Sequence, residues 1–276
     1  MKDEERRMRK RSERPIEAAQ RKSAWHTVSS AIKEEPEWWT AYLLGQHHSI
    51  YANAAQPRIK GSLWRLLRYI QRMGVAALRS PRMLPTIDFS PEVLVYAGTH
   101  NQQVSLDPVI EGLGRRGVLV SCVTSHQQHA SASATHWSML SLGALPRGFA
   151  VLMSICRLIA IRRELRRKDP MLLDNSVDAF FSVHVWSFYF FLLLKRLQPE
   201  LVLVSNDHNT ENRALINISR SLGIKTAYVQ HASVSPRFPA LRFDYSFLDG
   251  LIAKKIYEGC KGNRCHTASL PRMRHV

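Results

Sequence analysis

Three short polar runs hold the side chains of this sequence that are best suited to chemistry. Histidine and carboxylate side chains are the usual groups for moving protons near neutral pH. The runs supply eleven candidates: Thr99, His100 and Asn101; Asn206, Asp207, His208, Glu211 and Arg213; and Gln230, His231 and Ser233. Three histidines, an aspartate and a glutamate could therefore converge on one crevice.

Each of these residues also has an ordinary structural explanation. Asn209 or Thr210 is a typical N-cap, and Glu211 in the first turn of a helix is favoured by the helix dipole. His100 and His231 are equally compatible with loop histidines that bond to the backbone. The set as a whole favours function more strongly than any single member does, because its members follow predicted strands.

The elements that would position these runs alternate between strands and helices. Apolar, β-rich runs predict strands at 92–99, 118–124, 200–206, 224–230 and 243–248, and helical patterns cover 106–116, 149–168, 177–197 and 210–222. Residues 125–147 are typical of a loop. This order predicts an α/β fold with an open, doubly wound, Rossmann-like parallel sheet. Ligands of such sheets bind beyond the carboxyl ends of the strands, where all three runs fall.

Several common sites are not supported. The sequence has no HExxH or HxH spacing and no CxxC pair among its four cysteines, so no metal site is expected. It has no P-loop and no GxGxxG after a predicted strand, which disfavours an ordinary dinucleotide site. We expect no cofactor.

Charge restricts the partners without choosing among them. The 276 residues include 39 Lys and Arg against 22 Asp and Glu, a formal charge of +17 that attracts phosphates, nucleic acid or anionic membranes. Nucleic acid is disfavoured because no RRM, KH or zinc-finger signature is present. Residues 1–14 are charged and lack the apolar core of a signal peptide, and scattered cysteines fit a reducing cytoplasm.

Two segments bear on membranes. Residues 58–82 hold seven basic residues and no acid, with apolar residues at helical spacing, which is typical of a helix on anionic lipid but also of a surface helix with a solvated basic face. Residues 177–194 form an apolar stretch of 18 residues, the threshold for a spanning helix. Asp178 and His184 interrupt it, and a predicted strand follows, so we predict a buried helix.

The residues at 199–250 carry a resemblance to a known family. They resemble bacterial GT-B-type sugar-transfer proteins of capsule and surface polysaccharides, including glycerophosphotransferase-like and polysialyltransferase-like members, and share a layout with nucleotide-sugar 2-epimerases. In those proteins an "ND" or "GD" turn ends a strand, and a helix, a "GIKTxxVQH" strand and an "FP…D" stretch follow. The matching positions are Asn206–Asp207, Gly223–His231, Phe238–Pro239 and Asp244.

The resemblance implies a two-domain enzyme that transfers a sugar or glycerol-phosphate unit from a nucleotide-linked donor to a polysaccharide or glycolipid acceptor. The amino-terminal domain of such an enzyme binds the acceptor and supplies a general base, a role that His100 fits by its position. Asp207 would orient a histidine or bind an acceptor hydroxyl, and His208 and His231 compete for acid–base or phosphate contacts. The other seven candidates would bind substrate.

The same resemblance implies a second domain for the donor. We divide the chain into a basic, mainly helical or partly disordered region at 1–90, an acceptor-type domain at 91–250 and an irregular basic tail at 251–276. A donor domain needs on the order of 150 residues, more than the tail has. The expectation is therefore a truncated or frameshifted product, or a donor domain on a second chain.

Three other functions remain open at this point. A 2-epimerase-like enzyme would act on a nucleotide sugar with carboxylates at the reacting carbon, and the candidates here are richer in histidine. A non-catalytic remnant would bind sugar or polyanions only. A nucleic-acid binder rests on charge alone. The transferase hypothesis places the protein in the cytoplasm, peripheral to the inner face of the membrane, with the segments 58–82 and 157–168 on anionic lipid or glycan.

Overall fold

The computed structural model describes residues 24–33, 62–78, 90–124, 135–138, 144–168, 170–207, 209–234, 240–258 and 266–270. Three features named above lie outside these residues: His208, Phe238–Pro239 and both ends of the basic segment 58–82.

The described strands form one parallel sheet of seven strands, in the order β3-β2-β1-β4-β5-β6-β7. Their bounds are β1 (Val93–Ala97), β2 (Val120–Thr124), β3 (Thr135–Ser138), β4 (Leu201–Val204), β5 (Lys225–Val229), β6 (Tyr245–Asp249) and β7 (His266–Leu270). The order runs one way from β1 to β3 and the other way from β4 to β7, so the topology switches between β1 and β4. The predicted α/β, doubly wound, Rossmann-like parallel sheet is confirmed.

All five predicted strands are present, and two more were missed. β3 lies within the segment 125–147 that was expected to be a loop, and β7 lies within the tail that was expected to be irregular. Both are edge strands, and β7 (HTASL) has only one large apolar residue, Leu270. Neither strand has the continuous apolar run by which the central strands were recognised.

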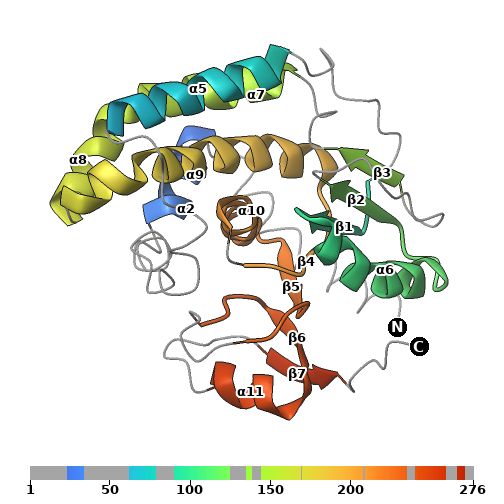
Figure 1. Ribbon diagram of the computed structural model, residues 1–276. Helices are drawn as coiled ribbons and strands as arrows, with labels where there is room; N and C mark the ends of the chain where they lie inside the picture. The colour runs from blue at the N-terminus through green and yellow to red at the C-terminus, as the bar shows by residue number, and fades with distance from the viewer. Residues whose placement is uncertain are drawn as a thin grey trace.

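The helices lie on both faces of the sheet (Figure 1). Their bounds are α2 (Ala24–Lys33), α5 (Ser62–Leu78), α6 (His100–Gly114), α7 (Ala144–Cys156), α8 (Leu158–Lys168), α9 (Pro170–Leu197), α10 (Thr210–Ser221) and α11 (Gly250–Glu258). α6 covers one face of the sheet, against β1 and β2, whereas α9 and α10 cover the other. α5, α7 and α8 pack on the outer side of α9.

Alternating strand residues divide the core between the two faces of the sheet. In β1, Val93, Val95 and Ala97 face α6, whereas Leu94 and Tyr96 face α9 and α10. Both sets are buried, as expected for a parallel sheet covered on both faces. The sequence segment 1–90 shares this core, because Val28 and Ala31 of α2 and Leu66 of α5 belong to the α9 cluster.

The apolar segment 177–194 lies in α9, and from residue 181 on its side chains are buried or half-buried, as predicted for a buried helix. Phe181, Phe188 and Phe190 are fully buried. The helix lies between α10 on one side and α5, α7 and α8 on the other. No helix in the described ranges combines the length and the apolar character that crossing a membrane requires. The predicted helix 149–168 is two helices, because the chain turns at Arg157 between α7 and α8.

Glycine ends two of the helices as predicted. Gly117 after α6 and Gly223 after α10 have φ angles of 77° and 75°, a left-handed conformation that favours glycine. After α10 the Gly223 N–H donates to the Arg220 carbonyl and the Ile224 N–H donates to the Ser219 carbonyl, the pair of bonds that defines a Schellman motif. At these two glycines the chain leaves its helix and enters the segment that leads to the amino end of β2 or β5.

Candidate functional site

The carboxyl ends of β1 and β4 lie next to each other at the topological switch point. The two strands pair in register from Val93↔Leu201 to Tyr96↔Val204, so the turns that follow them leave the sheet side by side. In open α/β sheets this is the position at which ligands bind. The first two polar runs of the sequence occupy these two turns.

The turn after β1 is organised by a capping arrangement at the start of α6. Thr99 is the N-cap, and its hydroxyl accepts a hydrogen bond from the Gln102 N–H at 3.4 Å. The Gln102 side-chain Oε1 accepts in return from the Gly98 N–H at 2.8 Å. Helix α6 therefore begins at His100, and residues 100–105, which precede the predicted helix 106–116, are its first turns.

Sequence reasoning had a signal for this start. A Thr followed three residues later by Gln is the pattern of a capping box, in which the two side chains satisfy free N–H groups at a helix start. Gln102 was not among the candidates, yet its side chain is 1 % exposed and holds the turn together. His100 and Asn101, the first residues of the helix, are exposed.

The turn after β4 is organised by side chains of α10. Asn209 is the N-cap and accepts from the Asn212 N–H at 3.1 Å. Asn212 donates from its side-chain Nδ2 to the Asn206 carbonyl. Arg213 donates from Nε to the Asp207 carbonyl at 2.7 Å. Two consecutive carbonyls of the turn are thus bound by two consecutive side chains of the helix.

The two turns lie in contact with each other. Ser205, at the end of β4, donates from its hydroxyl to the Gln102 carbonyl at 3.4 Å. A Cβ atom on Gly98 would lie 3.3 Å from the Tyr96 hydroxyl and 3.5 Å from the Asn209 side-chain nitrogen. A side chain at Gly98 would therefore press first on the Tyr96 hydroxyl of its own strand and would reach ordinary contact distance from Asn209 of the second turn.

Charged groups are buried beside these turns. Asp207 is 1 % exposed and Arg213 is 0 % exposed, the largest fully buried side chain in the described ranges. Burial raises the pKa of the Glu211 carboxyl, against the opposing effect of a backbone hydrogen bond. Burial also raises the pKa of the Tyr96 hydroxyl, together with the nearby charge of Glu211.

A second tyrosine, Tyr228, is influenced by the charge of Asp207. Burial raises the pKa of Tyr228 on β5, and Tyr257 and the charge of Asp207 raise it further. Tyr228 also stacks on Phe243, with ring centroids 5.2 Å apart. The interior behind the switch point therefore holds tyrosine hydroxyls and carboxylates that are close enough to affect one another's ionisation in a poorly solvated space.

The third polar run follows β5 at the same edge. Gln230 donates from Nε2 to the Ala232 carbonyl at 2.8 Å and accepts at Oε1 from the Asp249 N–H at 2.9 Å. Both ends of its side chain therefore join the turns after β5 and β6. His231 is half-buried and Ser233 is exposed.

Ten of the eleven candidates can now be placed at one edge of the sheet, and they differ in access. Thr99, His100, Asn101 and Ser233 are exposed, whereas Asn206, Glu211, Gln230 and His231 are half-buried. Asp207 and Arg213 are buried and stabilise the turn rather than facing solvent. His208 lies outside the described residues.

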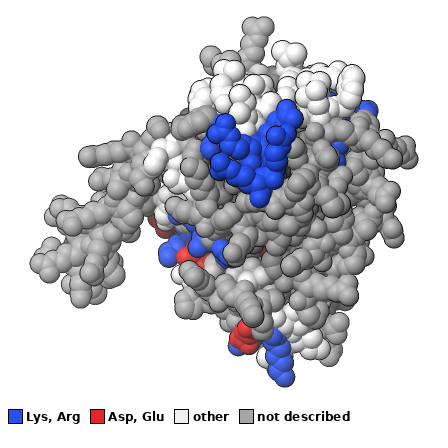
Figure 2. Space-filling model, turned by 90° about the vertical axis from the view of Figure 1, so that its left-hand side faces the viewer, with Lys and Arg blue, Asp and Glu red and all other residues white. Residues whose placement is uncertain are grey.

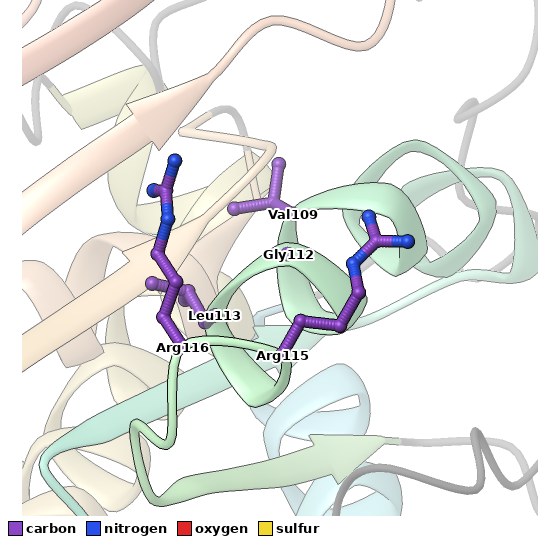
Figure 3. A pocket seen from close by; sticks show the side chains of 5 residues that line it. All are labelled: Val109, Gly112, Leu113, Arg115 and Arg116. Carbon is purple, nitrogen blue, oxygen red and sulfur yellow. The ribbon is translucent and has the colours of Figure 1, made fainter.

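The one hollow that we describe on the surface lies elsewhere. It has a volume of about 280 Å³ and is lined by Val109, Gly112, Leu113, Arg115 and Arg116 (Figure 3). Figure 3 shows the two guanidinium groups on either side of the hollow. These residues end α6, which runs back from the carboxyl edge, so the hollow is at the opposite edge from the candidates. It does not coincide with the switch point.

Metal ligands do not cluster in the described part of the chain: no group of three or more His, Cys, Asp or Glu side chains there is placed to share an ion. Of the cysteines, Cys122 is buried and Cys156 is exposed. Burial, with the nearby Asp107 charge, raises the pKa of the Cys122 thiol to about 12. This thiol is therefore protonated at neutral pH.

Fold and site define an α/β protein with a Rossmann-like parallel sheet and a polar switch point. No protein-family model, curated protein or solved structure matches the chain.

Proposed function

We propose that the protein is a GT-B-type sugar-transfer protein of bacterial surface polysaccharide synthesis, and that the described sheet is its acceptor-binding half. The observation that supports this proposal is the meeting of two polar turns at the switch point, where the Ser205 hydroxyl binds the Gln102 carbonyl and Gly98 lies near Asn209. The resemblance of residues 199–250 to such transferases supplies the chemistry. A transferred sugar or glycerol-phosphate unit would come from a nucleotide-linked donor.

His100 is the proposed general base. It is exposed at the first position of α6, at the edge where the two turns meet. In an inverting transfer its ring nitrogen would take the proton of the acceptor hydroxyl while that oxygen forms a bond to the donor carbon and the nucleotide leaves with the bonding electrons. Thr99 and Asn101, the neighbouring candidates, would bind acceptor hydroxyls.

The buried pair has a positioning role in this proposal. Arg213 binds the carbonyl of Asp207, and both side chains are shielded from solvent. They would hold the second turn, with Asn206, at the distance from α6 that an acceptor needs. His231 and Ser233 remain candidates for contacts on the β5 side of the crevice.

A donor-binding domain would complete the site, on a second polypeptide or on a longer form of this chain. The reaction needs no resident cofactor, because the nucleotide-linked donor is a substrate. We prefer this reaction to a 2-epimerase, which needs carboxylates at the reacting carbon. The two carboxylates nearest the switch point do not face solvent freely: Asp207 is buried and Glu211 is half-buried.

We also propose that the protein acts in the cytoplasm, at the inner face of the membrane, where a growing glycolipid or polysaccharide acceptor would be found. Basic segments support this location, since α8 exposes Arg162, Arg163, Arg166 and Arg167.

Ligand binding tests the proposal without the donor half. We expect at least one oligosaccharide from a panel of capsule-type acceptors to raise the melting temperature and to bind in calorimetry. The variant His100→Ala/Asn101→Ala should weaken that binding by about tenfold, the effect of losing one or two hydrogen bonds. Arg115→Ala, at the opposite edge of the sheet, is the matched control and should bind as the wild type does.

Two results would contradict the proposal. One is that no oligosaccharide in the panel binds at millimolar concentration. The other is that binding occurs but survives the His100→Ala/Asn101→Ala change. If a glycan binds, adding CMP-, UDP-, GDP- and CDP-linked donors and measuring nucleotide release tests transfer itself, with His100→Gln as the variant that should lose it.

A further inference from the structure

The outer helices expose a set of large apolar side chains. On α5 these include Leu63, Trp64 and Leu67, and on α7 and α8 they are Phe149, Leu152, Ile155 and Ile159. Trp64 is 70 % exposed, Leu152 is 58 % exposed and Ile159 is 75 % exposed. α5 and α7 lie side by side, and α8 continues from α7 (Figure 1). We call these seven residues the outer helical face.

α7 shows why this face differs from an ordinary protein surface. Its inner side packs on α9 through Ala150 and Ser154, which are 0 % exposed. Its outer side presents Phe149, Leu152 and Ile155 instead of charged residues. A helix that is apolar on both sides is expected in a protein interior or against lipid rather than facing water.

Basic side chains flank the apolar residues. The sequences of the three helices hold three arginines in α5, one in α7 and five basic residues in α8, against the single Glu164. Six of the arginines are described as exposed: Arg68, Arg72, Arg162, Arg163, Arg166 and Arg167. Figure 2 shows a compact group of Lys and Arg side chains bordered above by uncharged residues, on the side where α8 lies in Figure 1.

Apolar and cationic groups on one surface favour a particular partner. Leu, Ile and Trp side chains gain by entering the boundary between lipid headgroups and acyl chains, while arginines bind lipid phosphates beside them. A nucleic acid would complement the arginines but would leave the aliphatic side chains against a charged backbone. We infer that the outer helical face lies on an anionic bilayer surface, without crossing it.

This inference deepens the membrane part of the proposed function but does not depend on its sugar chemistry. α9 and α10 separate the outer helices from the sheet, so changes on the face leave the switch point intact. Failure of the glycan experiment would leave the vesicle result unchanged, and failure of vesicle binding would leave the glycan result unchanged. The two proposals can therefore be tested separately.

Vesicle sedimentation of the full chain is the primary test. The wild type should bind vesicles of phosphatidylcholine with about one third phosphatidylglycerol and should bind pure phosphatidylcholine much more weakly. Arg162→Gln/Arg163→Gln/Arg166→Gln/Arg167→Gln should lower the partition coefficient by at least about a hundredfold, since each basic residue near such a surface contributes about fivefold. Trp64→Ser/Leu152→Ser should lower it by at least about tenfold.

Matched controls exist elsewhere on the molecule. Leu251→Ser/Ile252→Ser removes two exposed apolar side chains of α11, which are 67 % and 78 % exposed. Arg115→Gln/Arg116→Gln removes two exposed arginines after α6. Both controls should sediment as the wild type does, because these side chains lie away from the outer helical face and the attraction of a basic residue to the bilayer falls off within a Debye length. Melting curves establish that each variant is folded.

Cys156 provides an independent readout, because it is exposed on α7 next to Ile155. With Cys260→Ser/Cys265→Ser as background, an environment-sensitive fluorophore on Cys156 should shift to the blue when anionic vesicles are added. Equal binding to neutral and anionic vesicles would overturn the inference. So would an equal loss in the α11 control, or tight binding of single-stranded RNA in the absence of vesicle binding.

Discussion

The charged residues at the two edges of the sheet differ in how far they are exposed to water. At the amino edge, Asp244 accepts from the Thr226 N–H at 2.8 Å, from the Thr226 hydroxyl at 3.0 Å and from Lys225 at 3.2 Å. These groups remain partly in water, since the Lys225 side chain is 61 % exposed. At the carboxyl edge, Asp207, Glu211 and Arg213 are buried or half-buried beside the two turns of the switch point.

The consequences for stability differ accordingly. Charged groups that stay near water and are well bonded add a little stability, whereas taking ions out of water costs more than most pairs return. The carboxyl edge also buries the Oδ1 atom of Asn212 with no hydrogen-bond partner in the described part of the chain, which is a further cost. Proteins commonly accept such costs where a site must be held in one geometry. This contrast supports the carboxyl edge as the functional one.

Replacing Arg213 should have the largest effect on stability at the carboxyl edge. Arg213→Met keeps much of the side-chain volume but removes the charge and the bond to the Asp207 carbonyl. We expect a loss of about 3 kcal/mol in the free energy of unfolding, because the buried carbonyl of Asp207 loses its charged hydrogen-bond donor. Urea unfolding measures the effect. Arg220→Met, on the exposed side of the same helix, should change stability by less than about 0.5 kcal/mol.

A loss of less than about 1 kcal/mol in Arg213→Met would mean that the bond from Arg213 does not hold the turn, and the edges would then differ only in burial.

The sequence predicted the central fold well because the central strands carry their own signal. β1 (VLVYA) and β4 (LVLV) are apolar at every position, since both faces of a parallel sheet are covered. The glycines that end α6 and α10 could also be recognised from the sequence, because few other residues adopt a positive φ. The predicted parallel direction of the strands then placed the polar runs at one edge.

Burial of polar residues could not be predicted in the same way. Arg213 sits in a helix whose exposed and buried positions depend on α2 and α9, which are distant in sequence. Asn217 of the same helix donates to the carbonyl of Ala31, a contact that no local pattern indicates. The apolar outer side of α7 was similarly hidden, because Phe149 and Leu152 fit a buried helix just as well as an exposed one.

Replacing Asp244 tests how much the charged group at the amino edge contributes to stability. Asp244→Ala removes three hydrogen bonds that join the start of β6 to the start of β5, and we expect a loss of about 1–3 kcal/mol in the free energy of unfolding at pH 7. Asp249→Ala, an exposed carboxylate at the other end of β6, is the control and should be nearly neutral. Chemical denaturation of both variants gives the comparison.

The loss in Asp244→Ala should depend on pH in a defined direction. Burial would raise the pKa of the Asp244 carboxyl, but the bonds from Thr226 and Lys225 outweigh it and the pKa is lowered. A carboxyl whose folded pKa is lowered contributes stability above its unfolded pKa and loses it as the pH falls through the folded value. The gap between wild type and variant should therefore shrink below about pH 4. A gap independent of pH would show that the hydroxyl and amide bonds, not the charge, carry the effect.

Glu211 should give the smallest effect and the opposite sign. Burial raises the pKa of its carboxyl, so the ionised form is disfavoured in the folded protein. A group of this kind contributes stability below its unfolded pKa and loses it as the pH rises through the folded value. Glu211→Gln should therefore raise the free energy of unfolding at pH 7 by about 1 kcal/mol, a rise of a few degrees in melting temperature, and the gain should vanish in acid. Glu111→Gln, exposed on α6, should show no gain at either pH.

A stabilised Glu211→Gln variant beside a destabilised Asp244→Ala variant would show that the amino edge is built for stability and that the carboxyl edge keeps a charge at a cost. Destabilisation in both variants would mean that Glu211 is as well bonded as Asp244.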